Sequence, residues 1–263
     1  MPEPSSTGQY NEKFIIALQW MWGDGYLAPG GHEEVDELLH NVNVNNRHVL
    51  DVGSGLGAID INLVQKYGAS SVLGIDVEQH LIEHATDRVK KAGLDEQVTF
   101  ELVEPGPLHF DDGSFEMVFS KDAIVHIPDK PAFYREVFRI LKPMGVFVGS
   151  DWLRGGEETY TPLAEEWLEF CHLNFDMRDL RQTQEAISTV GFQKVSLVDR
   201  NNWYIDEVKK ELATLSGVKY GRLVELIGEQ EASYRQKSSA LKQKVIELGF
   251  LRPTHFVAYK PAD

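Results

Sequence analysis

Short apolar runs alternate with amphipathic segments through the middle of this chain of 263 residues. Apolar runs bounded by polar or glycine-containing turns predict buried β-strands. They fall at residues 48–52, 71–76, 98–103, 115–120, 146–150, 192–198 and 254–259. Helices are predicted at 56–66, 78–92, 131–141, 162–174 and 182–190, and two long polar–apolar segments follow at 205–215 and 220–248. Strands that alternate with helices form a parallel sheet covered on both faces, so we expect an α/β fold with seven strands.

The first predicted strand leads directly into a turn with three glycines, in the sequence HVLDVGSGLG from His48 to Gly57. An apolar strand followed by glycines at alternate positions predicts a tight turn whose bare backbone approaches a ligand. A nucleotide-like cofactor is the natural occupant. The same glycines also fit the dinucleotide pattern G-x-G-x-x-A, so the turn alone does not distinguish between cofactors.

The rhythm of strands and helices changes after Asp151, and both ends of the chain carry an excess of helical pattern. We expect a single domain in three parts: a helical N-terminal lid (1–45), a cofactor-binding core (46–151) and a substrate cap (152–263) that includes the last strands. Open parallel sheets bind ligands at the carboxyl ends of their strands, so the lid and the cap would enclose a substrate there.

Composition narrows the range of partners. The formal net charge of −15 disfavours nucleic acid and anionic membrane surfaces, and no apolar run approaches the length of a membrane span. The single cysteine, Cys171, excludes internal disulfides, and residues 1–8 lack the pattern of a signal peptide, so we expect a cytoplasmic protein. Nine histidines and one cysteine form no metal-ligand spacing, so we expect no metal. A small molecule is the expected partner, and the sequence does not indicate an oligomeric state.

Three acidic residues at strand ends favour S-adenosylmethionine over NAD as the cofactor. Asp51 stands two residues before the first glycine, where it can meet the ammonium of a methionine group. Asp76 ends the second strand, where it can accept hydrogen bonds from ribose hydroxyls, although both cofactors contain a ribose. Glu104 follows the third strand, where it can cap an adenine amino group. The alternative for each acid is a helix cap or a turn residue.

The succession of these segments from His48 to Ser150 resembles the class I S-adenosylmethionine-dependent methyltransferases. The segments FEMV at 115–118 and LKPMG at 141–145 share in this resemblance. The family implies a Rossmann-like fold with a seven-stranded, mostly parallel sheet, helices on both faces and a helical cap. It also implies S-adenosylmethionine as the methyl donor, and it disfavours a dehydrogenase.

Candidate chemistry lies in the segment SKDAIVH after the fourth strand, which contains Asp122 and His126. An alkylamine is mostly protonated at pH 7, and methyl transfer to nitrogen needs a free lone pair, so a nearby group must take the proton. One helical turn would place both side chains on the same side, with Asp122 orienting the imidazole of His126. The alternative is a turn that only packs against the cofactor, with His126 satisfied by the backbone.

The N-terminal segment resembles that of the phosphoethanolamine methyltransferases of protozoa, nematodes and plants. The resemblance rests on QYN at 9–11, WMWGDGYLAPGG at 20–31, the segment from Asp122 to His126 and LGF at 248–250. It implies catalytic roles for Tyr10, Asp122 and His126, with the tyrosine closing over the substrate. The expected cofactor-binding residues are Gln9, Leu27, Ala28, Asp51, Gly53, Ser54, Gly55, Asp76, Val77, Glu104, Pro105 and Lys121.

The chain departs from that family at the positions where the family binds the phosphate of its substrate with tyrosines, an arginine and a lysine. Trp152 stands in place of a tyrosine after the fifth strand. A gapless count places Leu173 at the arginine position and Phe175 at another tyrosine position, and only Lys237 is retained. Loss of the guanidinium fork and two hydroxyls would remove most charge-assisted bonds to a dianion.

A lone lysine suits a monoanion such as a carboxylate, and Trp152 and Phe175 would add apolar faces that tolerate a cation. We therefore expect N-methylation of a small amine or amino acid, either phosphoethanolamine-like or resembling glycine, sarcosine or dimethylglycine. One inserted residue in the count would return Arg178 or Arg181 to the pocket. Two other interpretations stay open: an O- or C-methyltransferase of a larger natural product or sterol-like acceptor, and a cofactor-binding protein without catalysis.

Overall fold

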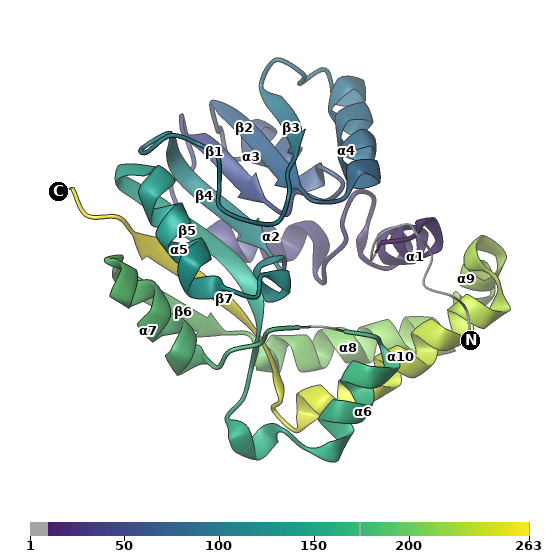
Figure 1. Cartoon of the computed structure of the whole chain (residues 1–263). Coiled ribbons are helices and arrows are strands. Elements are labelled where there is room, and N and C mark those ends of the chain that lie inside the picture. The colour runs from purple at the N-terminus through teal and green to yellow at the C-terminus, as the bar shows by residue number, and fades with distance from the viewer. Residues whose placement is uncertain (1–9, 174, 263) are drawn as a thin grey trace.

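A seven-stranded sheet forms the centre of the molecule (Figure 1). The computed structural model describes residues 10–173 and 175–262. The strands are β1 (His48–Val52), β2 (Ser71–Asp76), β3 (Val98–Leu102), β4 (Phe115–Lys121), β5 (Leu141–Arg154), β6 (Gln193–Asp199) and β7 (Leu251–Tyr259). Their order is β3-β2-β1-β4-β5-β7-β6, and β7 runs antiparallel to both of its neighbours. The predicted seven-stranded, mostly parallel α/β fold is confirmed.

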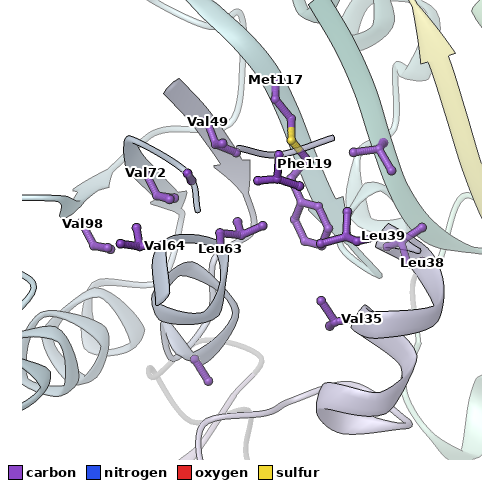
Figure 2. Packing of buried hydrophobic residues seen from close by; sticks show 14 of the residues in the cluster. Val35, Leu38, Leu39, Val49, Leu63, Val64, Val72, Val98, Met117 and Phe119 are labelled. Atoms are coloured by element: carbon purple, nitrogen blue, oxygen red, sulfur yellow. The ribbon is translucent and has the colours of Figure 1, made fainter. Parts of the chain in front are cut away.

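One face of the sheet packs against α2 (Gly31–Leu39) and α3 (Ala58–Gln65). Figure 2 shows Phe119 of β4 pointing toward Leu38 and Leu39 of α2, with Leu63 of α3 beside them. All four side chains are buried. The apolar residues of β4 therefore hold the N-terminal part of the chain against the sheet.

The opposite face packs against α5 (Lys130–Ile140) and α7 (Leu180–Val190). Phe147 of β5 lies at the centre of this cluster, against Phe133, Tyr134 and Phe256. The remaining helix of the core, α4 (Gln79–Ala92), packs on β2 and β3. Because apolar side chains cover both faces, the free carboxyl ends of β1, β2 and β4 form the edge at which a ligand can bind.

Helices from both ends of the chain gather beside the sheet (Figure 1). The C-terminal group comprises α6 (Pro162–Phe170), α8 (Asn201–Ser216), α9 (Tyr220–Ile227) and α10 (Glu229–Glu247), with α10 packed on the other three. The N-terminal helix α1 (Glu12–Trp22) packs against α9. The N-terminal helix α1 thus joins the C-terminal helical group. The division into lid, core and cap remains a prediction.

Two segments that differ from their predicted form lie in the second half of the chain. The strand β5 extends beyond Ser150 to Arg154, because antiparallel pairing with β7 continues to the pair Arg154–Leu251. The segment 220–248 is two helices, since Gly228 adopts φ +87° and interrupts the helical path. No helix within the described residues is long and apolar enough to cross a membrane.

A buried ion pair fixes the helix α2 to the part of the sheet formed by β6 and β7. Arg200 donates two hydrogen bonds to Glu34, at 3.0 and 2.8 Å, and Nε2 of His255 lies 2.7 Å from the same carboxylate. Glu34 is only 4% exposed. Burial raises its pKa, but the interactions with His255 and Arg200 outweigh this effect and leave the pKa lowered. This part of the predicted lid is consequently anchored in the core.

Replacing Arg200 by Met should cost about 3 kcal/mol of unfolding free energy, because Glu34 would remain buried with one partner removed. The matched control is Arg181→Met, which breaks the exposed i,i+4 pair with Glu185 and should cost less than about 0.5 kcal/mol. Denaturant unfolding of the two variants checks the difference. Equal losses would contradict an anchoring role for Arg200.

Candidate active site

The glycine turn after β1 lies at the carboxyl edge of the sheet and adopts a backbone that favours glycine. Gly53, Gly55 and Gly57 have φ values of +80°, +56° and +78°. A Cβ added at Gly53 would lie 2.3 Å from Cβ of Ala123, and one added at Gly55 would lie 3.2 Å from Leu27. The turn therefore forms a narrow cradle between the segment after β4 and the N-terminal part of the chain.

Asp76 joins this turn to the end of β2. Its carboxylate accepts hydrogen bonds from the backbone N–H groups of Gly55 and Glu78, each at 3.0 Å. Burial raises the pKa of Asp76, and these backbone donors act in the opposite direction. Val77 follows with 55% exposure, and Glu104 and Pro105 are also exposed after β3. The predicted adenine side of the site is thus open to solvent.

Two buried carboxylates lie close to the glycine turn. Asp51 and Asp60 are 1% and 0% exposed. Oδ1 of Asp51 and both carboxylate oxygens of Asp60 have no hydrogen-bond partner among the described residues. Burial is the main cause that raises the pKa of both carboxyls. The charge of Asp60 raises the pKa of Asp51 further, and the charge of Asp76 adds to the effect on both. Unpartnered buried carboxylates are costly, so this pair is suited to receive a cation.

Asp60 was not among the acids predicted at strand ends. It stands in the first turn of α3, nine residues after Asp51, on a helix that also carries Ile59, Ile61, Leu63 and Val64. The helix dipole stabilises a carboxylate in the first turn of any helix, so this position alone does not indicate that Asp60 is buried.

Asp122 lies at the end of β4, and its carboxylate accepts two hydrogen bonds from neighbouring side chains. The side chain accepts a hydrogen bond from Nζ of Lys121 at 2.8 Å and another from Oγ of Ser150 at 2.7 Å. Its own backbone N–H donates to the carbonyl of Ser150 at 2.8 Å. Asp122 adopts φ +58°, a conformation that is uncommon outside glycine and is found at functional sites.

His126 ends a 3-10 helix, Ile124–His126, rather than an α-helical turn that begins at Asp122. The expected helical turn is wrong, because the positive φ of Asp122 redirects the chain. The carboxylate of Asp122 is held by Lys121 and Ser150 instead of orienting the imidazole. The ring of His126 packs edge-on against Phe175, with centroids 5.2 Å apart. Burial, followed by the charge of Lys130, lowers the pKa of His126.

Tyr10 approaches the same edge from the N-terminal segment. Its ring stacks on Phe14 at 5.4 Å and packs in the apolar cluster that contains Leu27 and Leu56. Burial raises the pKa of Tyr10, and the negative charges of Asp76, Asp122 and Glu78 add to the effect. These charges act on the phenol because all of them lie at the carboxyl edge of the sheet. The predicted contact Gln9 lies outside the described residues.

The predicted substrate residues occupy two different environments. Trp152 contacts Tyr204 edge-on at 5.1 Å, and both belong to an apolar cluster that also includes Leu173 and Phe175. Lys237 is exposed on α10. The structure thus brings Trp152 and Phe175 into the cap near His126, but it leaves Lys237 at the surface.

The two arginines considered for the anion site also differ. Arg181 forms an exposed ion pair with Glu185 at 2.9 Å. Arg178 lies near the buried end of α5, where its positive charge affects the pKa values of Lys130 and Tyr134. Of these two side chains, Arg178 is the one located beside the turn that carries His126.

The arrangement was compared with known proteins. A family model described as a methyltransferase domain matches residues 43–216. Phosphoethanolamine N-methyltransferase 1 of Arabidopsis thaliana is 33% identical over 78% of this chain, which corresponds to 40% of the length of that relative. The chain therefore spans well under half of the plant relative that it matches.

Solved structures show the same fold. The phosphoethanolamine N-methyltransferase 2 of Haemonchus contortus, in complex with phosphomonomethylethanolamine and S-adenosylhomocysteine, superposes with a TM-score of 0.88 and 23% identity, over 96% of this chain and 59% of that one. A putative sarcosine dimethylglycine methyltransferase from Galdieria sulphuraria gives a TM-score of 0.76 and 21% identity, over 87% of this chain and 84% of that one. The predicted family and its Rossmann-like fold are confirmed. The chain belongs to the methyltransferase domain family, as a class I, S-adenosylmethionine-dependent member.

Proposed function

We propose that this protein N-methylates a small amine or amino acid, with His126 accepting the proton that the amine must lose. The observation that carries the proposal is the imidazole of His126, which packs against Phe175 and whose pKa is lowered by desolvation and by the charge of Lys130. A lowered pKa keeps the imidazole neutral at pH 7, which is the form that can accept a proton.

The reaction requires one proton transfer and one methyl transfer. Bound S-adenosylmethionine supplies an electrophilic methyl group on a sulfonium. The protonated amine gives its proton to His126, and the freed lone pair of the nitrogen forms the new N–C bond as the S–C bond breaks. Asp122 is fixed by Lys121 and Ser150 and offers negative charge beside the cationic nitrogen. Tyr10, with its raised pKa, stays protonated and can donate a hydrogen bond to the acceptor.

The residues around the glycine turn fit the donor. The positive φ values of Gly53 and Gly55 keep the backbone bare, and Leu27 closes the cradle from the N-terminal side. The buried carboxylates of Asp51 and Asp60 suit the ammonium of the methionine group, and the carboxylate of Asp76 suits ribose hydroxyls.

The cap favours a small acceptor that has a cationic nitrogen and carries no more than one negative charge. Trp152, Tyr204 and Phe175 supply aromatic faces, which attract ammonium groups. Leu173 lies in this apolar cluster, so no guanidinium occupies that position. Sarcosine- and dimethylglycine-like amino acids suit these features better than phosphoethanolamine, and a neighbour with the same fold is named for such acceptors.

Incubating the purified chain with methyl-labelled S-adenosylmethionine and a panel of acceptors tests the proposal. The panel should contain glycine, sarcosine, dimethylglycine, ethanolamine and phosphoethanolamine, together with bulky phenols and isoprenoids. We expect mass spectrometry to find label on the nitrogen of a small amine. Label confined to the bulky acceptors would support an O- or C-methyltransferase and overturn the proposal.

The variants Tyr10→Phe and His126→Ala should each lower kcat about 100-fold while leaving the Kd for S-adenosylmethionine within about twofold, because both side chains serve the acceptor. The exposed residues Tyr160 and His109 provide the controls Tyr160→Phe and His109→Gln, which should leave both quantities unchanged. Calorimetry measures the Kd and single-turnover kinetics the chemical step. An equal loss in Kd and kcat would contradict the catalytic assignment.

Asp60→Asn should weaken S-adenosylmethionine binding about tenfold, because one carboxylate facing the ammonium is lost. The unliganded variant should gain stability relative to the wild type as the pH rises above about 4. The raised pKa of Asp60 means that its protonated form stabilises the fold, and this contribution disappears as the carboxyl ionises.

We expect the difference in unfolding free energy between Asp60→Asn and the wild type to grow by at least about 1 kcal/mol between pH 5 and pH 8. Thermal unfolding at each pH provides the measurement. Asp87→Asn, at an exposed position of α4, is the control and should show no such trend. If the difference in unfolding free energy between Asp60→Asn and the wild type does not change with pH, the pKa of Asp60 is not raised by burial and the prediction is wrong.

A further inference from the structure

Lys130 is buried at a position where a positive charge is unfavourable for two reasons. Its side chain is 0% exposed, and it is the first residue of α5. Removing an ammonium from water is costly, and the first turn of a helix carries a partial positive charge that repels a cation. Neither helix formation nor core packing accounts for a lysine here, so its contacts must explain it.

The polar contacts of Lys130 are made with the turn that carries His126 and with one acid beside it. Nζ of Lys130 donates hydrogen bonds to the backbone carbonyls of Ile124 and Ile127, each at 2.9 Å. These carbonyls flank His126 on either side in the sequence. A carboxylate oxygen of Asp176 lies 3.7 Å from the same ammonium. The three N–H donors of Lys130 are thus directed at the backbone of the turn and at one acid.

Asp151 holds the same turn from β5. Its Oδ1 accepts a hydrogen bond from the backbone N–H of Val125 at 2.8 Å. The carbonyl of Val125 accepts a further bond, at 3.1 Å, from the backbone N–H of Asp176. Groups outside the turn therefore hold the carbonyls of Ile124, Val125 and Ile127 and the N–H of Val125.

We propose that Lys130 and Asp151 are positioning residues, which fix the 3-10 turn so that the imidazole of His126 faces the acceptor as a neutral base. This inference rests on the proposed function and assigns roles to two residues that do not touch the substrate. The lysine contributes its charge as well as its hydrogen bonds, because a cation beside an imidazole disfavours the imidazolium form.

The pKa of His126 agrees with this geometry. Burial lowers it most, and the charge of Lys130 lowers it further. Asp151, Asp176 and Arg178 also act on the pKa of Lys130. Asp122 and Asp129 flank the turn in the sequence. Burial raises the pKa of Asp151 to about 7, although the charge of Lys130 opposes this, so near neutral pH the carboxyl is only partly ionised.

Lys260 is a matched control for Lys130. It donates hydrogen bonds to two carbonyls at the opposite end of α5, those of Phe138 and Leu141, at 2.7 and 2.6 Å. Lys130→Met removes two lysine–carbonyl hydrogen bonds at the start of α5, and Lys260→Met removes two at its end. Both variants should therefore lower the Tm. Only the first removes a charge and a brace from the turn of His126.

The first experiment measures the titration of His126 by NMR, with its signal assigned through the variant His126→Gln. In Lys130→Met we expect the imidazole to titrate at a higher pH than in the wild type, because a neighbouring positive charge is gone. The acid limb of the pH profile of kcat should move the same way, with kcat lowered about tenfold or more. The Kd for S-adenosylmethionine should stay within about twofold, and Lys260→Met should change none of these quantities.

The second experiment does not depend on the folding of Lys130→Met. Asp151→Asn keeps an oxygen that can accept the N–H of Val125 and should retain kcat within about threefold, whereas Asp151→Ala should lose about tenfold. An unchanged His126 titration in Lys130→Met, or full turnover by Asp151→Ala, would overturn the inference. Because the titration needs no acceptor, it decides the positioning role even if no amine is methylated.

Discussion

The contact between the glycine turn and the segment after β4 is the constraint on which the site depends. A side chain at Gly53 would collide with Ala123, the residue that follows Asp122 and precedes the 3-10 helix of His126. The turn that we assign to the donor and the turn that we assign to the acceptor thus pack directly on each other. Their separation is set by the absence of one Cβ, so donor and acceptor chemistry are coupled through backbone packing.

Buried charge is distributed around this contact in two ways. Glu34 and Arg200 neutralise one another and hold α2 to the sheet, so their pairing serves the fold. Asp51 and Asp60 have no ion-pair partner among the described residues, and burial raises their pKa values. In the first arrangement each charge is compensated, and removing one partner would leave the other buried without compensation. The second becomes favourable when a cation arrives, which is the expected property of a binding site.

The departures from the phosphoethanolamine methyltransferase pattern agree with the structure in part. Leu173 and Phe175 pack against the apolar cluster of the cap, and their assignment to the arginine and tyrosine positions stays a prediction. Lys237 is exposed, although the same count retained it as the anion-binding residue. A sequence count fixes which turn of a helix a residue belongs to. Which side of α10 faces the site depends on how that helix packs against α6 and α8.

The sequence by itself determined the sheet, the glycine turn and the family, because alternation of apolar runs and left-handed glycines are local properties of the chain. It also brought Asp51, Asp76 and Asp122 to one edge, since parallel strands end together. Tertiary structure alone decided how those groups are used. Ser150 and Lys121 hold Asp122, and Lys130 and Asp151 hold the turn of His126, through contacts between neighbouring strands and a helix terminus. Such contacts depend on burial and backbone direction, which no spacing of residue types encodes.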